Sequence, residues 1–205
     1  MQKIRLFIDM DGTLARFHDE VMYLERMYEK GFFENLKPFE NMVEAVKKLM
    51  RRDTVEVFIL SSTIGAQCIE EKNRWLDKYL PGIDREHRLF ADGMSIPKPL
   101  LVPDASINRN SQTAKYKITI SEYNILLDDY NKNLSEWKEA GGTPIKAKNN
   151  INHKGLIGEL WRGDLIDITS NAEKITFGLL EKAAALSQTE ERADDEDEDY
   201  EDMEM

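Results

Sequence analysis

The chain has 205 residues, of which 41% are hydrophobic and 33% charged, and its formal net charge is −11. A chain of this length can bury a substantial core, so we expect one domain with a small insert or tail. Most of the negative charge lies in one segment: residues 189–205 hold eleven acidic residues and one arginine, whereas residues 1–188 hold 28 acidic and 27 basic residues. The body is therefore nearly neutral and has no basic stripe, which argues against polymeric nucleic acid as a partner.

Cysteine content and the N-terminal segment narrow the class further. Cys68 is the only cysteine, which excludes an internal disulfide and a cysteine-rich metal site. The apolar run within MQKIRLFIDMDG is too short for a signal peptide or a membrane span. We therefore expect a soluble, cytoplasmic protein with no membrane association.

In chain order, the first half of the sequence alternates strand and helix patterns. Residues 4–8 and 55–60 are short, rich in β-branched and aromatic residues, and end in polar groups, which predicts two buried strands. Between them, apolar residues at helical spacing in FENMVEAVKKLMRR predict a helix. A second helix is predicted across AQCIEEKNRWLDKYL, where the following Pro81-Gly82 ends it.

The second half continues this alternation. HRLF predicts a short strand, residues 123–127 a further strand, KNLSEWKEAG a helix that closes at Gly141-Gly142, and TPIKAK a last strand. Strands alternating with helices predict an α/β fold with a mostly parallel central sheet and helices on both faces. In such sheets the ligand lies beyond the carboxyl ends of the strands, near the point where strand order reverses.

Two segments lie outside this pattern. Residues 15–39 contain one predicted helix and the aromatic pair Phe32-Phe33 but are too few for a separate domain, so we expect a small helical cap insert. Residues 188–205 form an acidic run that cannot bury enough apolar surface to order itself. The predicted organisation is one domain over residues 1–187 and a disordered tail over residues 188–205.

Polar residues gather at the predicted strand ends or in the adjoining loops, and in the assumed sheet they project toward one edge. They are Asp9 and Asp11, Ser61 and Ser62, Lys115 and Lys117, and Asp128 and Asp129. Carboxylates packed close together repel one another and are costly to desolvate, which indicates a cation or protons between them. A hard divalent ion such as Mg²⁺ takes oxygen ligands and keeps a substrate phosphate in its shell.

An edge of this composition suits phosphoryl transfer. An aspartate facing an electrophilic phosphorus can act as the nucleophile and form an aspartyl-phosphate intermediate. Asp11 can then protonate the leaving oxygen and later deprotonate the attacking water. Serine hydroxyls and backbone N–H groups of the turns can complete the phosphate contacts. The three histidines are scattered without metal-ligand spacing, and we assign no role to His18, His87 or His153.

The string DMDGTL, a strand-end serine, a lysine and an Asp-Asp pair after ILL together resemble the haloacid dehalogenase (HAD) superfamily of phosphotransferases. The resemblance spans about residues 4–130 and implies a Rossmann-like fold. It implies that Asp9 is the nucleophile and a Mg²⁺ ligand and that Asp11 is the acid/base. It further implies that Ser61 hydrogen-bonds the phosphoryl group and that Lys115 is the charge clamp. The implied metal-site residues are Asp9, Asp11, Asp128 and Asp129, with Asp129 the preferred direct ligand.

A narrower resemblance is to the 5'(3')-deoxyribonucleotidases, and it rests on five features. These are the DMDG opening, a nearby aromatic residue (here Phe17), adjacent strand-end hydroxyls (Ser61-Ser62), a Lys-x-x-Trp step (KNRW, residues 72–75) and the ending ILLDD. The resemblance implies that Phe17 flanks the base of a nucleoside monophosphate, and we expect Ser62, Gly12 and Thr13 to be further substrate contacts. The insert is shorter than the cap of that family, and the shifted lysine motif leaves Lys115 and Lys117 as alternatives.

The predicted function is therefore a Mg²⁺-dependent phosphomonoesterase for a small phosphorylated substrate, above all a 5'(3')-deoxyribonucleotidase. One alternative is a HAD phosphatase for another small phosphate metabolite. Another is a non-catalytic phosphate-binding or regulatory module whose acidic tail docks on a basic partner. Simpler structural roles also stay open, because Ser62 can cap the following helix and one of the Asp128-Asp129 pair can cap the next.

Overall fold

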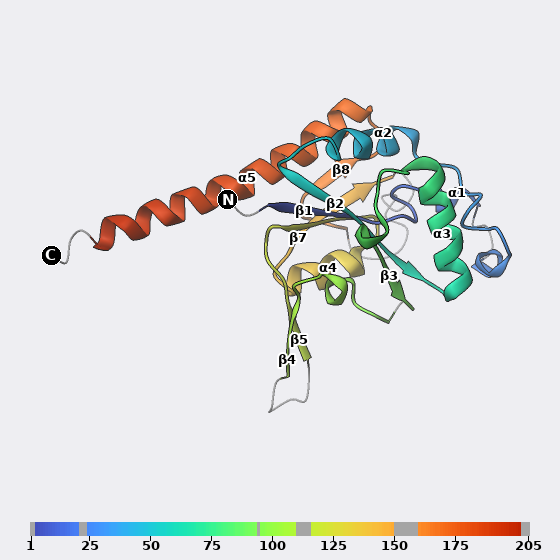
Figure 1. The fold of residues 1–205 in the computed structure, drawn as a ribbon, viewed down its shortest axis with the longest axis horizontal. Helices are drawn as coiled ribbons and strands as arrows, with labels where there is room; N and C mark the ends of the chain where they lie inside the picture. Colours follow the sequence, from blue (N-terminus) through green and yellow to red (C-terminus); the bar gives the residue numbers. More distant parts are fainter. Residues whose placement is uncertain (1–2, 21–23, 94, 110–115, 150–159, 202–205) are drawn as a thin grey trace.

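The computed structural model describes residues 3–20, 24–93, 95–109, 116–149 and 160–201, and its centre is a six-stranded sheet (Figure 1). The strands are β1 (Ile4–Ile8), β2 (Val55–Thr63), β3 (Arg88–Asp92), β6 (Asn124–Asp128), β7 (Thr143–Lys148) and β8 (Leu165–Asp167). They lie in the order β3-β2-β1-β6-β7-β8, and every neighbouring pair is parallel. The predicted α/β class with a mostly parallel sheet is confirmed.

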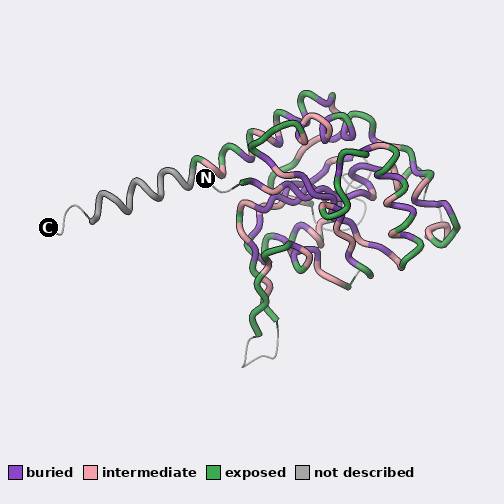
Figure 2. The backbone as a smooth tube through the Cα atoms, in the orientation of Figure 1, coloured by how far each residue is buried: buried purple, intermediate pink, exposed green. Residues whose placement is uncertain are grey.

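Successive residues of a strand point to opposite faces of the sheet, so a strand of apolar residues gives the sheet two apolar faces. Helices cover both of these faces. Leu6 and Ile8 of β1 belong to a core shared with α2 (Glu40–Leu49), α3 (Ala66–Tyr79) and the start of α5 (Ala172–Glu201). Phe7 points the other way, stacks on Phe58 at 4.9 Å between ring centroids, and packs with α4 (Asn131–Glu139) and η3 (Lys98–Leu101). Figure 2 shows the strands as a buried centre beneath more exposed helices.

The predicted helices and strands of the central fold are present, and the main differences concern short or late elements. TPIKAK forms β7 as expected, but it is not the last strand, because β8 pairs beyond it at the sheet edge. β8 has only three residues, too few for an alternating pattern to stand out in the sequence. An exposed antiparallel hairpin of β4 (Ser106–Arg109) and β5 (Tyr116–Thr119) also extends from the body (Figures 1 and 2).

The insert over residues 15–39 is attached to the body, and its role as a cap stays a prediction. In the described residues it holds two short helical segments, α1 (Phe17–Glu20) and η1 (Leu24–Tyr28), in place of the single helix that we expected. The buried Glu71 carboxylate of α3 accepts hydrogen bonds from the backbone N–H groups of Gly31 at 2.7 Å and Phe33 at 3.1 Å. The insert is therefore anchored to α3 through its own backbone.

Helix α5 reaches into the segment for which we predicted disorder. Its first turns pack on the body through buried residues at helical spacing, Ala172, Ile175, Leu179 and Ala183, and the backbone stays helical to Glu201. Figure 1 shows the end of α5 extending past the rest of the molecule. Once a helix is nucleated on a core, each further residue extends it at little cost, which explains the continuation. The division into a domain over residues 1–187 and an independent tail stays a prediction.

Among the helices of the described residues, none combines the length and apolarity that crossing a membrane requires.

Candidate active site

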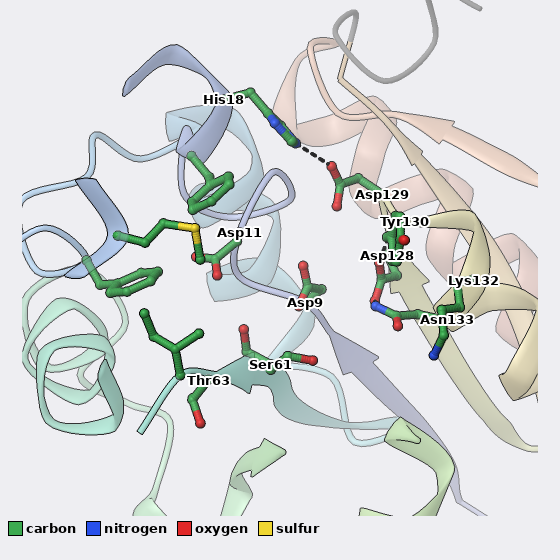
Figure 3. Close-up of a pocket in the computed structure, with 15 residues that line it drawn as sticks. Asp9, Asp11, His18, Ser61, Thr63, Asp128, Asp129, Tyr130, Lys132 and Asn133 are labelled. Atoms are coloured by element: carbon green, nitrogen blue, oxygen red, sulfur yellow. Dashed lines mark hydrogen bonds and ion pairs between the residues drawn. The ribbon is translucent and has the colours of Figure 1, made fainter. Parts of the chain in front are cut away.

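The candidate site lies where the carboxyl ends of β1, β2 and β6 meet (Figure 3). From β1 the chain builds β2 and β3 on one side and β6, β7 and β8 on the other, so strand order reverses between β1 and β6. Ligands of open α/β sheets bind at such a reversal. Asp9 follows β1 directly, its backbone N–H donates to the carbonyl of Leu127 at 3.0 Å, and Asp128 ends β6.

Three buried carboxylates form a cluster at this point. One ligand oxygen from each of Asp9, Asp128 and Asp129 lies within 4.8 Å of those of the other two. Burial raises the pKa of Asp9 to about 7, although the charge of Lys98 acts in the opposite direction. Burial also raises the pKa of Asp129, against the hydrogen bond from His18. Three buried hard oxygen donors fit a divalent cation, so this triad can hold one.

A buried lysine that we had not predicted at the site, Lys98, lies against two carboxylates of the triad. Its Nζ lies 2.6 Å from Oδ1 of Asp9 and 2.6 Å from Oδ2 of Asp128, and its side chain is 1% exposed. Burial alone would lower the pKa of Lys98, but Asp128 and Asp9 together raise it. Lys115 lies outside the described residues, and Lys117 is exposed on the hairpin strand β5.

A second buried lysine, Lys72 of α3, connects Asp11 to the two serines at the end of β2. Its Nζ lies 2.6 Å from Oδ2 of Asp11, 2.8 Å from Oγ of Ser61 and 2.7 Å from the carbonyl of Ser62. Asp11 therefore lies beside the triad and pairs with a lysine of its own, and its predicted part in the metal site stays a prediction. The sequence signal that we missed is a lysine on the buried face of an amphipathic helix, a rare position for a charge.

Asp129 is held by donors from three other segments. His18 Nε2 donates to its Oδ2 at 2.9 Å, Asn149 Nδ2 donates to the same oxygen at 3.0 Å, and Lys146 donates to its backbone carbonyl. The hydrogen bond to Asp129 raises the pKa of His18, a residue to which we assigned no role. Gly12, at φ +82°, permits the close approach, since a Cβ there would lie 2.2 Å from Oδ2 of Asp129.

A cavity of about 700 Å³ opens above these groups. It is lined by Asp9, Asp11, Phe17, His18, Met27, Phe33, Ser61, Ser62, Thr63, Ile64, Asp128, Asp129, Tyr130, Lys132 and Asn133. The structure thus brings together the predicted carboxylates, both serines and Phe17. Gly12 and Thr13, which we expected to contact substrate, do not line the cavity, and Thr13 is fully buried.

Comparison with known families identifies the family to which the chain is related. Residues 16–150 match the family model described as "5' nucleotidase, deoxy (Pyrimidine), cytosolic type C protein". The chain belongs to this family. The matched residues contain Lys72, Lys98 and the Asp128-Asp129 pair, and they begin after Asp9 and Asp11. As a 5'-nucleotidase family member, the protein is of the class of hydrolases acting on phosphoric monoesters, which confirms the predicted enzyme class.

One solved structure supports the fold of this nucleotidase, and a second is also similar in part. A haloacid dehalogenase-like hydrolase from Burkholderia xenovorans LB400 is 14% identical, with a TM-score of 0.52 over 87% of this chain and 99% of the other. The HAD-like fold is thereby confirmed. The structure of the Pnkp1/Rnl/Hen1 complex is 20% identical, with a TM-score of 0.48 over 72% of this chain. The match spans 47%, about half, of the length of that chain. A search of curated proteins returned no match.

Proposed function

We propose that the protein is a Mg²⁺-dependent phosphomonoesterase that acts on deoxynucleoside monophosphates through an aspartyl-phosphate intermediate on Asp9. The observation that carries the proposal is that Asp9, a member of the buried triad, lines the same cavity as Asp11. A protein that only binds phosphate has no need of a nucleophile beside a second carboxylate. We further propose a cytosolic location, which agrees with the description of the family.

In the first step, a carboxylate oxygen of Asp9 attacks phosphorus, and the bond from phosphorus to the ester oxygen breaks. The hydrogen bond from Lys98 to Oδ1 at 2.6 Å orients the nucleophile and favours its ionised form. Asp11 faces the same cavity and gives its proton to the leaving oxygen, which departs as the alcohol.

In the second step, Asp11 takes a proton from water, and the oxygen of that water attacks the phosphorus of the aspartyl phosphate. The bond between phosphorus and Asp9 breaks, which releases inorganic phosphate and restores both carboxyl groups to their starting states. Lys72 donates to Asp11 at 2.6 Å and to Ser61 Oγ at 2.8 Å. Because the Ser61 oxygen accepts from Lys72, its own hydrogen can be donated to a phosphate oxygen.

The metal site would use Asp9, Asp128 and Asp129. A donor set of carboxylate oxygens suits Mg²⁺, which prefers hard ligands and commonly shares its shell with substrate phosphate. When bound there, Mg²⁺ supplies positive charge that offsets the charge of the phosphate and of the triad.

The cavity favours a small substrate that combines one phosphate with a flat apolar group. Phe17, Met27 and Phe33 of the insert provide apolar and aromatic lining, together with Ile64, which follows β2. Among the lining residues the basic side chains are His18 and Lys132, and Lys132 Nζ already lies 2.5 Å from a carboxylate oxygen of Glu136. A triphosphate would bring more charge than this lining can offset, whereas a nucleoside monophosphate fits it.

The proposal is tested by phosphate release from a panel of deoxyribonucleoside and ribonucleoside monophosphates, with 5' or 3' phosphate, and of sugar phosphates. Wild type and Asp9→Asn are compared in Mg²⁺ and in EDTA. Asp104→Asn is the matched control, because that aspartate pairs with Arg5 at 2.6 Å outside the cavity. We expect Mg²⁺-dependent release from deoxynucleoside monophosphates by wild type and the control, and none by Asp9→Asn. Phosphate release from sugar phosphates alone would contradict the proposed substrate class. Full turnover by Asp9→Asn would contradict the proposed role of Asp9 as the nucleophile.

A further inference from the structure

His18 links the insert to the metal triad, although nothing in the proposed chemistry uses it. It lies in α1, and its Nε2 is 2.9 Å from Oδ2 of Asp129, which follows β6 (Figure 3). A carboxylate oxygen accepts hydrogen bonds, so Nε2 carries the hydrogen and donates it. The Asp129 side chain is 5% exposed, so this donor reaches a carboxylate that is otherwise buried in the body.

The Asp129 carboxylate is oriented from two directions. His18 approaches from the insert, and Asn149, which follows β7, donates from Nδ2 to the same oxygen at 3.0 Å. Asn149 also donates to the backbone carbonyl of Gly12 at 2.9 Å, so it is itself held within the body. Donors that fix a metal-binding carboxylate in this way commonly contribute about 10–100-fold to metal affinity.

His18 also contacts the aromatic lining of the cavity. Its ring packs edge-on against Phe17, with centroids 5.4 Å apart and planes at 84°. Phe17 in turn stacks on Phe33, at 6.4 Å and 15°, and both rings line the cavity. The same imidazole therefore touches the carboxylate of the triad and the apolar side of the cavity, where the organic part of a substrate would lie.

We propose that His18 is a positioning residue that couples metal binding at the triad to the placement of the Phe17 and Phe33 wall. This inference rests on the proposed function, since it takes the triad to be the metal site. A cation that fixes the Asp129 carboxylate keeps its Oδ2 in place as the acceptor for His18 and so holds the insert against the body. Substrate packed on the wall holds His18 in turn, and by linkage metal and substrate must raise each other's affinity by the same factor.

The test measures Mg²⁺ affinity by isothermal titration calorimetry, with no turnover involved. His18→Leu removes the donor and keeps an apolar side chain against Phe17, whereas His18→Gln keeps an N–H donor. His87→Leu is the matched control, because His87 is also paired with a carboxylate, Glu56 at 3.1 Å, with similar exposure (28% against 27%) and lies outside the cavity. Thermal unfolding of each variant without metal checks that it is folded.

We expect His18→Leu to weaken Mg²⁺ binding by about 10–100-fold, His18→Gln to recover much of the loss, and His87→Leu to bind as wild type does. The titration is then repeated with a non-hydrolysable phosphonate analogue of a deoxynucleoside monophosphate. The analogue should raise Mg²⁺ affinity in wild type, and this gain should shrink toward onefold in His18→Leu.

Wild-type Mg²⁺ affinity in a folded His18→Leu variant, or an unchanged gain from the analogue, would overturn the inference. These results are separable from a failure of the proposed function. A wild-type protein that neither binds Mg²⁺ nor hydrolyses nucleotides contradicts the proposed function. A wild-type protein that does both, with an insensitive His18→Leu variant, contradicts only the role of His18.

Discussion

Two aspartates separated by one residue acquire different surroundings because each faces its own buried lysine. Asp9 lies against Lys98, which it shares with Asp128, and Asp11 lies against Lys72, which also holds Ser61. Enzymes that use two carboxyl groups for different tasks separate them by environment in this manner. Separate partners let the two aspartates take the separate roles that we propose, Asp9 as the nucleophile and Asp11 as the acid/base.

Lys98→Met should abolish turnover and destabilise the protein, because it leaves Asp9 and Asp128 buried without the cation between them. Breaking a buried ion pair by removing one partner costs about 3–5 kcal/mol. Urea unfolding without metal measures this loss. Lys117→Met is the control, since an exposed hairpin residue should change the unfolding free energy by less than about 0.5 kcal/mol.

Lys115→Met belongs in the same series, because Lys115 as the charge clamp stays a prediction. If Lys115→Met abolishes turnover while Lys98→Met retains it, then the assignment of the clamp to Lys98 is wrong.

From the sequence we placed the residues at strand ends and Phe17 near one another, but we did not place Lys98, Lys72 or His18 there. Asp9, Asp128 and Asp129 occupy strand ends, and parallel strands bring such positions to one edge regardless of the loops. Lys98 lies between Pro97 and Pro99 after a loop, so nothing in the local pattern aims it at Asp9. The approach of Lys72 and His18 likewise depends on how a helix and the insert pack, which no local spacing reveals.

At the scale of elements, the insert is held by a carboxylate that caps its backbone. Both oxygens of Glu71 are used, one by the N–H of Gly31 and the side chain of Gln67, and the other by the N–H of Phe33. Trp75 of the same helix donates to the carbonyl of Leu36 at 2.8 Å. Helix α3 therefore positions the apolar wall of the cavity.

Glu71→Ala should loosen the insert, because two backbone N–H groups lose their acceptor at a cost of about 1–3 kcal/mol each. Hydrogen exchange at Gly31 and Phe33 should accelerate, and KM should rise more than kcat falls, since the wall contacts substrate away from the reacting atoms. Glu70→Ala on the exposed side of the same helix is the control. Unchanged exchange at both amides would show that Glu71 does not anchor the insert.

The predictions of helices and strands were correct where the pattern of apolar residues agrees with the packing of the element. β1 is buried on both faces and α2 along one, and their positions agree with the prediction within about three residues. The hairpin of β4 and β5 is exposed, so burial imposes no alternation on its sequence. The first turns of α5 carry buried residues at helical spacing, a signal that was available and that we did not use.

At the scale of the whole molecule, most of the net negative charge and the candidate active site belong to different parts of the chain. The acidic segment over residues 189–205 starts within α5, and Ala183 is the last buried residue of that helix among the side chains that the structure describes. The residues of the proposed catalytic and metal sites, in contrast, all lie between Asp9 and Asn149 in the sequence. The two parts should therefore be independent.

A chain that ends at Ser187 should keep its fold and its turnover. Because the described core contacts of α5 come from its first turns, we expect the free energy of unfolding to change by less than about 0.5 kcal/mol. Thermal unfolding and phosphate release, compared with the full chain, measure this. A truncated protein that stays folded but loses turnover would show that the acidic segment takes part in catalysis, and loss of a bound partner instead would favour a docking role for it.

The covalent intermediate on Asp9 is the central claim, and acid quenching of the reaction with ³²P-labelled deoxynucleoside monophosphate in Mg²⁺ tests it most directly. We expect ³²P on the protein, located at Asp9 by peptide mapping, increased in Asp11→Asn because the second step is slowed, and absent in Asp9→Asn. Phosphate release by wild type with no labelled protein in either wild type or Asp11→Asn, together with turnover that survives Asp9→Asn, would contradict the account.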